Sequence, residues 1–236
     1  GMVNSNFSNA SGINDPNNYS TVRDILKMSR YLIKNYPGYY TYFEEKTFTW
    51  DRTGGDPITQ NNRNPLLYKN IGVDGIKTGF LTVEKYSLAS SMKTGQRRIT
   101  AIGSGFESKN DRSKESIKML SWAFRNFDTI QVAKKDQDLL SLKIWMGTQH
   151  KVSVSVGEDL FFTVPRRKKN TIKAIVEYNE PIKAPLIKGE AIGKLKIYIG
   201  DDLKKEVNLL SNEDIKKTNI FSRVFRSLNY LVWGDV

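Results

Sequence analysis

Three consecutive residues, Lys77, Thr78 and Gly79, combine groups that could hold an anionic, extended ligand. Lysine supplies a compact positive charge, and threonine supplies a hydroxyl donor beside it. Glycine lacks the Cβ that would keep another backbone from pairing with the strand. The surrounding run IGVDGIKTGF (71–80) mixes β-branched residues with glycine. We therefore expect the three residues to lie on the edge of a β-strand.

A second Lys-Thr-Gly occurs at residues 93–95, and it completes a formal Ser-x-x-Lys from Ser90 to Lys93. In an enzyme such a serine would be a nucleophile and such a lysine its base. One ammonium, however, cannot both activate a serine on a helix and line a strand edge. Short motifs also match by chance. We therefore interpret residues 91–97 as a polar turn between two strands.

The elements upstream of the first triplet follow from the spacing of apolar residues. Ser20 or Thr21 can cap a helix that reaches about Asn35, where Pro37-Gly38 ends it. Residues 46–64 have the pattern of a β-hairpin.

Downstream of the triplet, strand patterns recur near residues 86–91 and 97–104, which predicts a three-stranded antiparallel sheet. Residues 108–111 offer caps for a helix that reaches about Phe127. Its apolar stripe can cover one face of the sheet.

An aromatic cluster extends from the last turns of the first helix to the start of the hairpin. A cofactor or nucleic-acid platform is one interpretation, and packing in a core is the one that we expect. The cluster consists of Tyr31, Tyr36, Tyr39, Tyr40, Tyr42 and Phe43.

From about Thr129 the chain consists of short alternating runs separated by Gly, Pro, Asn and Asp. Their near-regular spacing predicts a small all-β sandwich or barrel, with a domain boundary near residues 127–133. No catalytic cluster is visible there, so we expect a spacer or docking module. The runs are LLSLKIW, KVSVSV, DLFFTV, TIKAIVEY, AIGKLKIYIG and KKEVNLL.

The spacing of apolar residues in 213–233 predicts a final helix with one broad apolar face and a basic polar side. This pattern is typical of a helix that lies in the plane of an anionic bilayer. The alternative is an ordinary amphipathic helix packed on its own domain. The apolar face contains Ile220, Phe221, Val224, Phe225, Leu228, Leu231 and Val232, and the basic residues are Lys216, Lys217, Arg223 and Arg226.

The 236 residues include no cysteine and one histidine, His150. These counts exclude a disulfide framework and a thiolate or multi-histidine metal site. We expect no metal or cofactor, and we expect His150 in a surface turn.

The formal net charge is +12. Basic residues are spread along the whole chain, and the one tight run, at residues 166–169, is expected in a solvated loop. A nucleic-acid partner would require basic residues massed on one element with stacking aromatics. The charge therefore favours anionic surfaces in general over nucleic acid.

The surroundings of the first triplet resemble the D-alanyl-D-alanine carboxypeptidases, the low-molecular-mass penicillin-binding proteins. The resemblance rests on Asn62-Arg63-Asn64, on Val73 to Gly79, on Leu88-Ala89-Ser90 and on Gly95-Gln96-Arg97-Arg98. Lys-Thr-Gly is a short motif of penicillin-binding proteins and serine β-lactamases. The match extends from about Phe7 to the C-terminus, and a joint match over that span is specific.

The resemblance implies an α+β fold in three parts. Residues 1–128 would form part of a serine β-lactamase/transpeptidase-like domain, an antiparallel sheet with helices. Residues 129–212 would form the small all-β sandwich domain, and residues 213–236 an amphipathic membrane-anchor helix.

The resemblance also implies a substrate-binding site. Lys77 and Thr78, beside Gly79, would hold the substrate carboxylate, and the backbone N–H of Phe80 would be half of an oxyanion hole. Some relatives have histidine where this chain has Phe80. Arg112, at the start of a helix where its charge opposes the helix dipole, would help hold the carboxylate. The ligands implied are peptidoglycan stem peptides and β-lactams.

In such enzymes a helical Ser-x-x-Lys provides the nucleophile and its base, and a Ser-x-Asn completes the site. Both precede a Phe-x-Asn-Ala-Ser-Gly loop, which here is residues 7–12. We therefore expect no catalytic residue within the chain, and an inactive polypeptide alone. The parent would be a serine-type D-Ala-D-Ala carboxypeptidase outside the cytoplasm (periplasmic), peripheral on the cytoplasmic membrane. The alternative is a non-catalytic cell-wall binding module, and the oligomeric state stays open.

Overall fold

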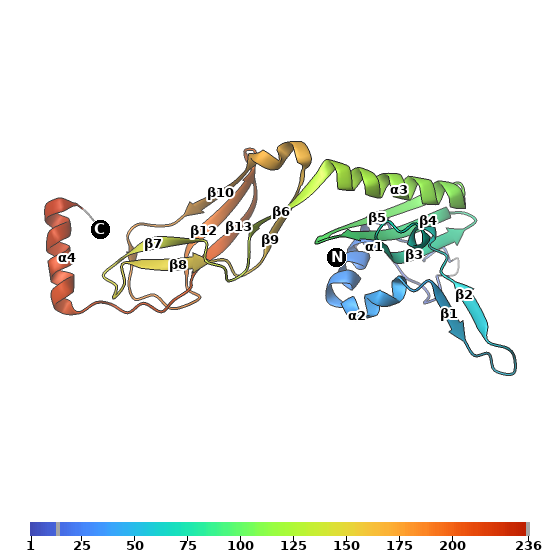
Figure 1. Ribbon diagram of the computed structural model, residues 1–236, viewed down its shortest axis with the longest axis horizontal. Coiled ribbons are helices and arrows are strands. Elements are labelled where there is room, and N and C mark those ends of the chain that lie inside the picture. The colour runs from blue at the N-terminus through green and yellow to red at the C-terminus, as the bar shows by residue number, and fades with distance from the viewer. Residues whose placement is uncertain (13–14, 235–236) are drawn as a thin grey trace. The chain divides into compact units, whose positions relative to one another are not determined.

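The computed structural model (Figure 1) describes residues 1–12 and 15–234. Its contacts divide the chain into unit 1, Gly1–Asn126, and unit 2, Phe127–Val236. One helix and one strand adjoin at this division, because α3 (Lys109–Asn126) ends where β6 (Phe127–Ala133) begins.

The centre of unit 1 is a three-stranded antiparallel sheet in the order β3 (Val73–Leu81), β4 (Lys85–Thr94), β5 (Arg97–Phe106). The predicted strands are confirmed, and β3 is an edge strand. Its register pairs Lys77 with Ala89 and Thr78 with Leu88. The turn between β4 and β5 is narrower than we expected, because Lys93 and Thr94 still belong to β4.

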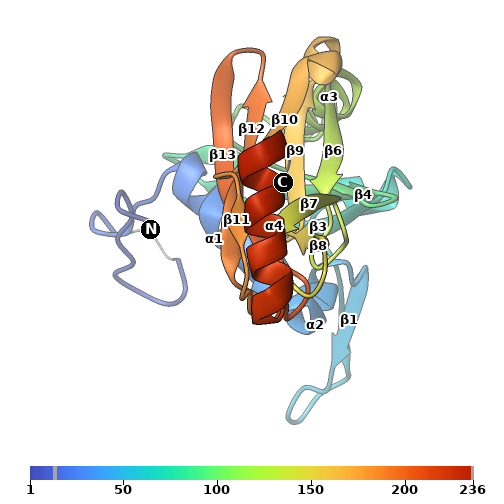
Figure 2. The same cartoon turned by 90° about the vertical axis from the view of Figure 1, so that its left-hand side faces the viewer.

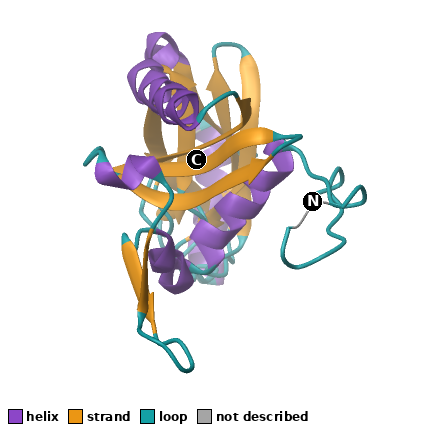
Figure 3. Cartoon of the chain, turned by 90° about the vertical axis from the view of Figure 1, so that its right-hand side faces the viewer, coloured by secondary structure: helices purple, strands orange, loops and turns teal. Residues whose placement is uncertain are grey.

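Helices cover both faces of this sheet (Figure 3). On one face α3 packs Leu120 against Leu88 and Ala101. The Oγ of Ser108 accepts the N–H of Asp111 at 3.0 Å, which fixes the start of α3 as predicted. The other face carries a second cluster under α1 (Val22–Asn35) and α2 (Pro37–Tyr40).

The helix predicted from residue 20 or 21 is confirmed as α1, whose cap is Thr21. Asp24, with no exposed side-chain surface, accepts the N–H of Asn4 and the hydroxyl of Ser5, both at 2.9 Å. The predicted hairpin is also confirmed, as β1 (Thr47–Trp50) and β2 (Ile58–Asn61).

The prediction that the aromatic cluster packs in a core is wrong for four of its six members. Only Tyr40 is buried, and Phe43 packs against it. The other four are tyrosines near the end of α1 and beyond it, and three of them are joined by ring contacts, Tyr31 with Tyr36 and Tyr36 with Tyr39. The exposed members are Tyr31, Tyr36, Tyr39 and Tyr42.

Unit 2 is a β-sandwich-like unit of two sheets, as the alternating runs predicted. The two-stranded sheet pairs β6 with β9 (Leu160–Pro165). The six-stranded sheet has the order β10-β12-β13-β8-β7-β11. Its strands are β7 (Leu140–Trp145), β8 (Lys151–Ser155), β10 (Ile172–Glu177), β11 (Ile182–Lys183), β12 (Ala191–Ile199) and β13 (Asp202–Ser211).

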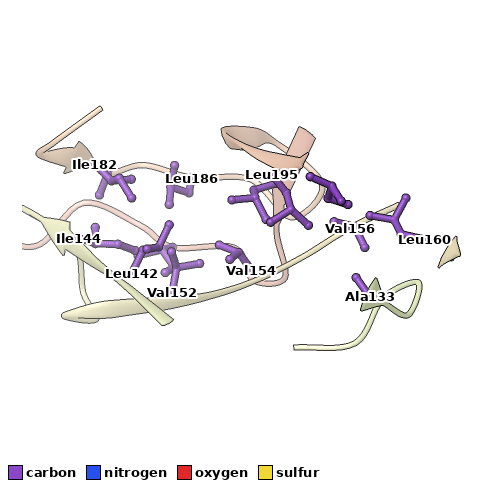
Figure 4. Close-up of a cluster of buried hydrophobic side chains, with 14 residues drawn as sticks. Ala133, Leu142, Ile144, Val152, Val154, Val156, Leu160, Ile182, Leu186 and Leu195 are labelled. Atoms are coloured by element: carbon purple, nitrogen blue, oxygen red, sulfur yellow. The ribbon is translucent and has the colours of Figure 1, made fainter. Parts of the chain in front are cut away.

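One apolar core of fourteen buried side chains joins the two sheets of unit 2 (Figure 4). Val152, Val154 and Val156 alternate inward along β8 and the residue beyond it, with no exposed surface. The basic run expected in a loop instead forms the start of the 3-10 helix Arg166–Thr171, and its four basic side chains are exposed.

The final helix, α4 (Ile220–Trp233), is shorter than we expected (Figure 2). Asn219 caps it by accepting the N–H of Ser222 at 2.8 Å. The preceding residues are extended because Ile215 is needed in the core, where it is 1% exposed. In the described residues, no helix has the length and apolar character needed to cross a membrane.

Candidate functional site

The structure places Lys77 and Thr78 on the edge strand of unit 1, with the Lys77 side chain exposed. Their pairing partners belong to the clusters on opposite faces of the sheet: Ala89 on the α1 side and Leu88 on the α3 side. Because side chains alternate along a strand, the two side chains leave β3 on opposite faces. The Lys77 ammonium donates to the Thr78 carbonyl at 2.7 Å and so lies along the strand edge.

The structure gives a reason for glycine at position 79 that the sequence did not predict. A Cβ at Gly79 would stand 2.3 Å from the Oγ of Ser87, its pairing partner on β4. The missing side chain therefore makes room for the neighbouring strand. The expected reason, access for the backbone of a ligand, is not the contact that the structure shows.

Phe80 and Arg112 are brought together through a third residue, Tyr86. The Phe80 and Tyr86 rings lie 4.5 Å apart between centroids, on paired positions of β3 and β4. The Arg112 guanidinium lies 5.7 Å from the Tyr86 ring centroid, a cation–π distance. Arg112 therefore reaches the end of the Lys-Thr-Gly strand from the first turn of α3.

Arg112 is only 6% exposed, so it is not a solvated side chain in the first turn of the helix. Burial lowers the pKa of its guanidinium because the charged form loses hydration. Its Nη2 approaches the Arg63 carbonyl at 3.5 Å, and its buried Nε has no acceptor among the described residues. A buried cation with an unused donor is costly unless an anion completes it.

A second unused donor lies in the adjoining segment. Asn64 is 1% exposed, and its Oδ1 accepts the N–H of Leu66 at 3.1 Å. Its Nδ2 finds no acceptor in the part of the chain that the structure describes. The Asn62-Arg63-Asn64 stretch thus faces the same region as the start of α3.

Sequence reasoning missed a polar network behind the Lys-Thr-Gly strand. Asp74, on β3, accepts the Tyr40 hydroxyl and the Arg98 Nη1, each at 2.8 Å, and its other oxygen lies 2.6 Å from the Arg98 Nη2. Arg98 also donates to the Ser91 Oγ at 2.7 Å. A Cβ at Gly75 would stand 2.7 Å from the Tyr40 hydroxyl. The network therefore ties β3 to β4, β5 and α2 three residues before Lys77.

Charge is stabilised within this network. Partial burial disfavours the charged form of Arg98, but the Asp74 carboxylate outweighs it and raises the pKa of Arg98. Burial, helped by the adjacent Asp74 carboxylate, also raises the pKa of the Tyr40 hydroxyl, so that this group stays a donor.

The second Lys-Thr-Gly does not lie in the polar turn that we expected for residues 91–97, because Ser91 to Thr94 belong to β4. Ser90 is 1% exposed on β4, and its Oγ donates to the Ala101 carbonyl at 3.1 Å. Three residues apart on a strand, Ser90 and Lys93 also face opposite sides of the sheet. This pair is therefore not built for nucleophilic chemistry.

Among the described residues, no group of three His, Cys, Asp or Glu side chains could hold a metal ion. His150, expected in a surface turn, is exposed, and its Nε2 lies 3.4 Å from the Arg226 Nη2 on α4.

Comparison with known families finds two matches along the chain. The D-alanyl-D-alanine carboxypeptidase family matches residues 1–106. A model described as penicillin-binding protein 5, C-terminal domain, matches residues 127–217. The first match covers the Lys-Thr-Gly strand and its polar network, and the second covers the sandwich.

Individual relatives agree with this. The chain is 32% identical to D-alanyl-D-alanine carboxypeptidase DacA of Haemophilus influenzae, over 99% of this chain and 59% of the relative. It is 32% identical to DacC of Escherichia coli, over 95% of this chain and 56% of the relative. A crystal structure of penicillin-binding protein 5 from Haemophilus influenzae matches with a TM-score of 0.76 and 32% identity, over 92% of this chain and 62% of that one. The chain thus spans a little over half the length of these curated relatives.

Proposed function

The chain belongs to the D-alanyl-D-alanine carboxypeptidase family of low-molecular-mass penicillin-binding proteins, and from that premise we propose that it carries the carboxylate-binding side of such an enzyme's active site. The parent protein would remove the terminal D-Ala from peptidoglycan stem pentapeptides and would bind β-lactams.

The observation that carries this proposal is the buried cation beside the edge strand. Arg112 is 6% exposed, retains an unused Nε donor and contacts Tyr86, whose ring lies against Phe80 at the end of the Lys-Thr-Gly run. A carboxylate placed there would complete the hydrogen bonds of the guanidinium in a partly desolvated setting, where charge-assisted bonds are strongest.

Each residue has a separate role in the proposed mechanism. At the exposed edge of β3, the Lys77 ammonium and the Thr78 hydroxyl would reach the terminal carboxylate from opposite faces of the strand. Arg112 would hold the same carboxylate, which orients the scissile amide along β3. The N–H of Phe80 donates to the oxyanion that forms on the carbonyl of the penultimate D-Ala. These are binding and electrostatic roles, so none of them requires these residues to form a covalent bond.

The covalent step would be carried by a serine and a lysine upstream of the residues described. The serine oxygen attacks the penultimate carbonyl, the lysine takes the serine proton, and D-Ala leaves as the amine that receives it. Water then hydrolyses the acyl-enzyme. We infer that the polypeptide of residues 1–236 alone forms no acyl-enzyme.

Labelling with a fluorescent penicillin tests both parts. The parent protein should become covalently labelled, and residues 1–236 alone should not. Arg112→Ala in the parent should lower the acylation efficiency at least about 30-fold, because it removes a buried charged partner of the carboxylate. Arg125→Ala, on the exposed end of the same helix, is the matched control.

Two outcomes would contradict the proposal. Labelling of residues 1–236 alone would place a nucleophile within them. No labelling of the parent would favour the second candidate, a non-catalytic cell-wall binding module at the membrane surface.

The proposed location is outside the cytoplasm, peripheral on the cytoplasmic membrane. Support comes from α4, on which seven apolar side chains are more than half exposed: Ile220, Phe221, Val224, Phe225, Leu228, Leu231 and Val232. An exposed apolar patch of this kind is typical of an interaction site and of helices that lie in a bilayer interface.

A further inference from the structure

A basic pocket lies within unit 2, between α4 and the edge of the six-stranded sheet that ends in β11. Its cavity volume is about 680 Å³, and its sheet side includes Trp145 and Lys183. The helix side is contributed by the first turns of α4, and Lys217 lies at the join between the two.

Every ionisable side chain that lines this pocket is a cation. Lys183, Lys217 and Arg223 come from β11, from the extended segment before α4 and from α4 itself. Among the described residues, none of the three has an ion pair or a side-chain hydrogen bond, whereas several other lysines of unit 2 do. Three neighbouring, uncompensated positive charges favour binding of an anion.

The pocket also has an apolar wall that continues onto the outside of the helix. Ile220, Val224 and Leu228 line the pocket, and they belong to the apolar face of α4 that solvent contacts. A ligand that fits this surface therefore has an anionic group joined to long apolar chains. Inorganic phosphate has no group for the apolar wall.

The pocket is held open by contacts that fix α4 on the sheet. The Arg226 Nη1 donates to the Gly147 carbonyl at 3.2 Å, and the Tyr230 ring lies 5.6 Å from the Trp145 ring. In the segment before the helix, Thr218 donates its N–H to the Met146 carbonyl at 2.9 Å. The three cations therefore converge from elements that are tied to one another.

We propose that this basic pocket binds the phosphate of an anionic glycerophospholipid headgroup, while the acyl chains of that lipid lie along the apolar face of α4. The inference rests on the proposed membrane association of the helix and goes beyond it in one respect. A helix that only lies in the interface has no use for Lys183, which is on a β-strand. The pocket makes this β-strand residue part of lipid recognition.

Vesicle co-sedimentation of residues 1–236 tests the proposal. Vesicles of phosphatidylcholine with phosphatidylglycerol should bind more protein than vesicles of phosphatidylcholine alone. Lys183→Gln and Lys217→Gln should each lower binding to the anionic vesicles about fivefold, the factor expected for one basic residue at an anionic surface. Neither variant should change binding to the neutral vesicles.

Lys173→Gln is the matched control. Lys173 is an exposed lysine on β10, the opposite edge of the same sheet, and no ion pair involves it among the described residues. If Lys173→Gln and Lys183→Gln lower binding to the anionic vesicles equally, the pocket proposal is wrong, and the overall positive charge of the chain explains the binding. A Lys183→Gln protein that binds like the unchanged chain would overturn it too.

Binding of a soluble short-chain lipid distinguishes a lipid phosphate from inorganic phosphate. Short-chain phosphatidylglycerol, below its micelle concentration, should shift the tryptophan fluorescence of the chain in a saturable way, and Trp145→Phe should remove that shift. Inorganic phosphate at the same concentration should produce none, and an equal shift with phosphate would contradict the role of the apolar wall. Failure to bind any vesicle would instead remove the membrane association itself, and the pocket proposal with it.

Discussion

The two units bury very different kinds of side chain. Unit 2 has one cluster of fourteen buried apolar residues shared by two sheets. Unit 1 has two small clusters, of four and three buried residues, on opposite faces of a three-stranded sheet. It also buries Asp24, Asn64 and Arg112, whereas the only buried polar residues described in unit 2 are Ser155 and Ser211.

Buried polar and charged groups are costly unless they are paired, and an apolar core of equal volume is at least as stable. Unit 1 nevertheless buries such groups, and one of them, Arg112, lies against Tyr86 beside the end of β3. The contrast indicates that packing of apolar side chains constrains the sequence of unit 2. In unit 1, part of the apolar core is replaced by polar groups that hold β3 and Arg112 in place. The test is to measure the free energy of unfolding and the rate of penicillin acylation separately for each variant.

The largest effect is expected in the core of unit 2. Ile197, on β12, has no exposed surface, so Ile197→Ala should lower the free energy of unfolding of unit 2 by about 3 kcal/mol. Urea unfolding followed by the fluorescence of Trp145 measures this. Ile175→Ala, at a position that is 48% exposed, should cost less than about 0.5 kcal/mol.

Penicillin acylation of the parent protein should be unchanged by Ile197→Ala. A parallel loss of acylation would show that the two units do not act separately, and the contrast between them would fail.

Lys77→Ala should have the opposite effect, a loss of acylation without a loss of stability. Its side chain is exposed and bonded only to a backbone carbonyl of its own strand, so the free energy of unfolding should change by less than about 0.5 kcal/mol. Acylation of the parent by penicillin should fall about 100-fold, because a charged partner of the carboxylate is lost.

Lys93→Ala, in the second Lys-Thr-Gly, is the control for Lys77→Ala and should leave acylation unchanged. Stopped-flow measurement of the acylation rate distinguishes the two. Equal losses would mean that the wrong triplet has been assigned to the site.

Asp74→Ala combines both kinds of effect. It leaves the Arg98 side chain, 26% exposed, without its carboxylate, so unit 1 should lose about 2 kcal/mol of unfolding free energy. Acylation should also fall, since the network holds β3 three residues before Lys77. Glu107→Ala, which removes only the exposed ion pair with Lys85, should cost less than about 0.5 kcal/mol.

Asp74→Asn provides a further check, because an amide keeps one acceptor and should restore part of the stability. An Asp74→Ala protein that is fully stable and acylated at the normal rate would show that the network is incidental.

The smallest effect separates two adjacent tyrosines. Tyr40→Phe removes the hydroxyl bonded to Asp74 and should cost about 1 kcal/mol in thermal unfolding of unit 1. Tyr39→Phe, on a side chain that is 67% exposed, should leave the midpoint unchanged. If the two variants shift the midpoint equally, the hydrogen bond contributes nothing.

The elements of unit 1 could be predicted because their signals are local. Thr21 and Ser108 are caps, Gly95 ends a strand, and the apolar stripe of α3 has helical spacing. The polar network could not be predicted this way. Asp74 is 34 residues from Tyr40 and 24 residues from Arg98, and no pattern in the sequence announces a contact at such separations.

In unit 2 the missed elements are those whose sequence is ambiguous. Strand β6 follows α3 directly, without a glycine or proline to separate them. Strand β11 is only two residues long and pairs in parallel with β7. The predicted final helix began too early, because Ile215 belongs to the core of the sandwich and the helix begins only after its cap, Asn219.

The segment before α4 determines how that helix would respond to a mechanical load. Leu186 and Ile215 exchange two backbone hydrogen bonds of 2.9 Å, and the backbones of Lys216 and Thr218 bond to those of Thr148 and Met146, just beyond the end of β7. A pull on the helix would reach the sandwich through these bonds and the buried Ile215, and not through slack chain. If α4 is held in a bilayer, a force on the helix would therefore be transmitted directly to the sandwich, because, in the described residues, no flexible linker lies between them to absorb it.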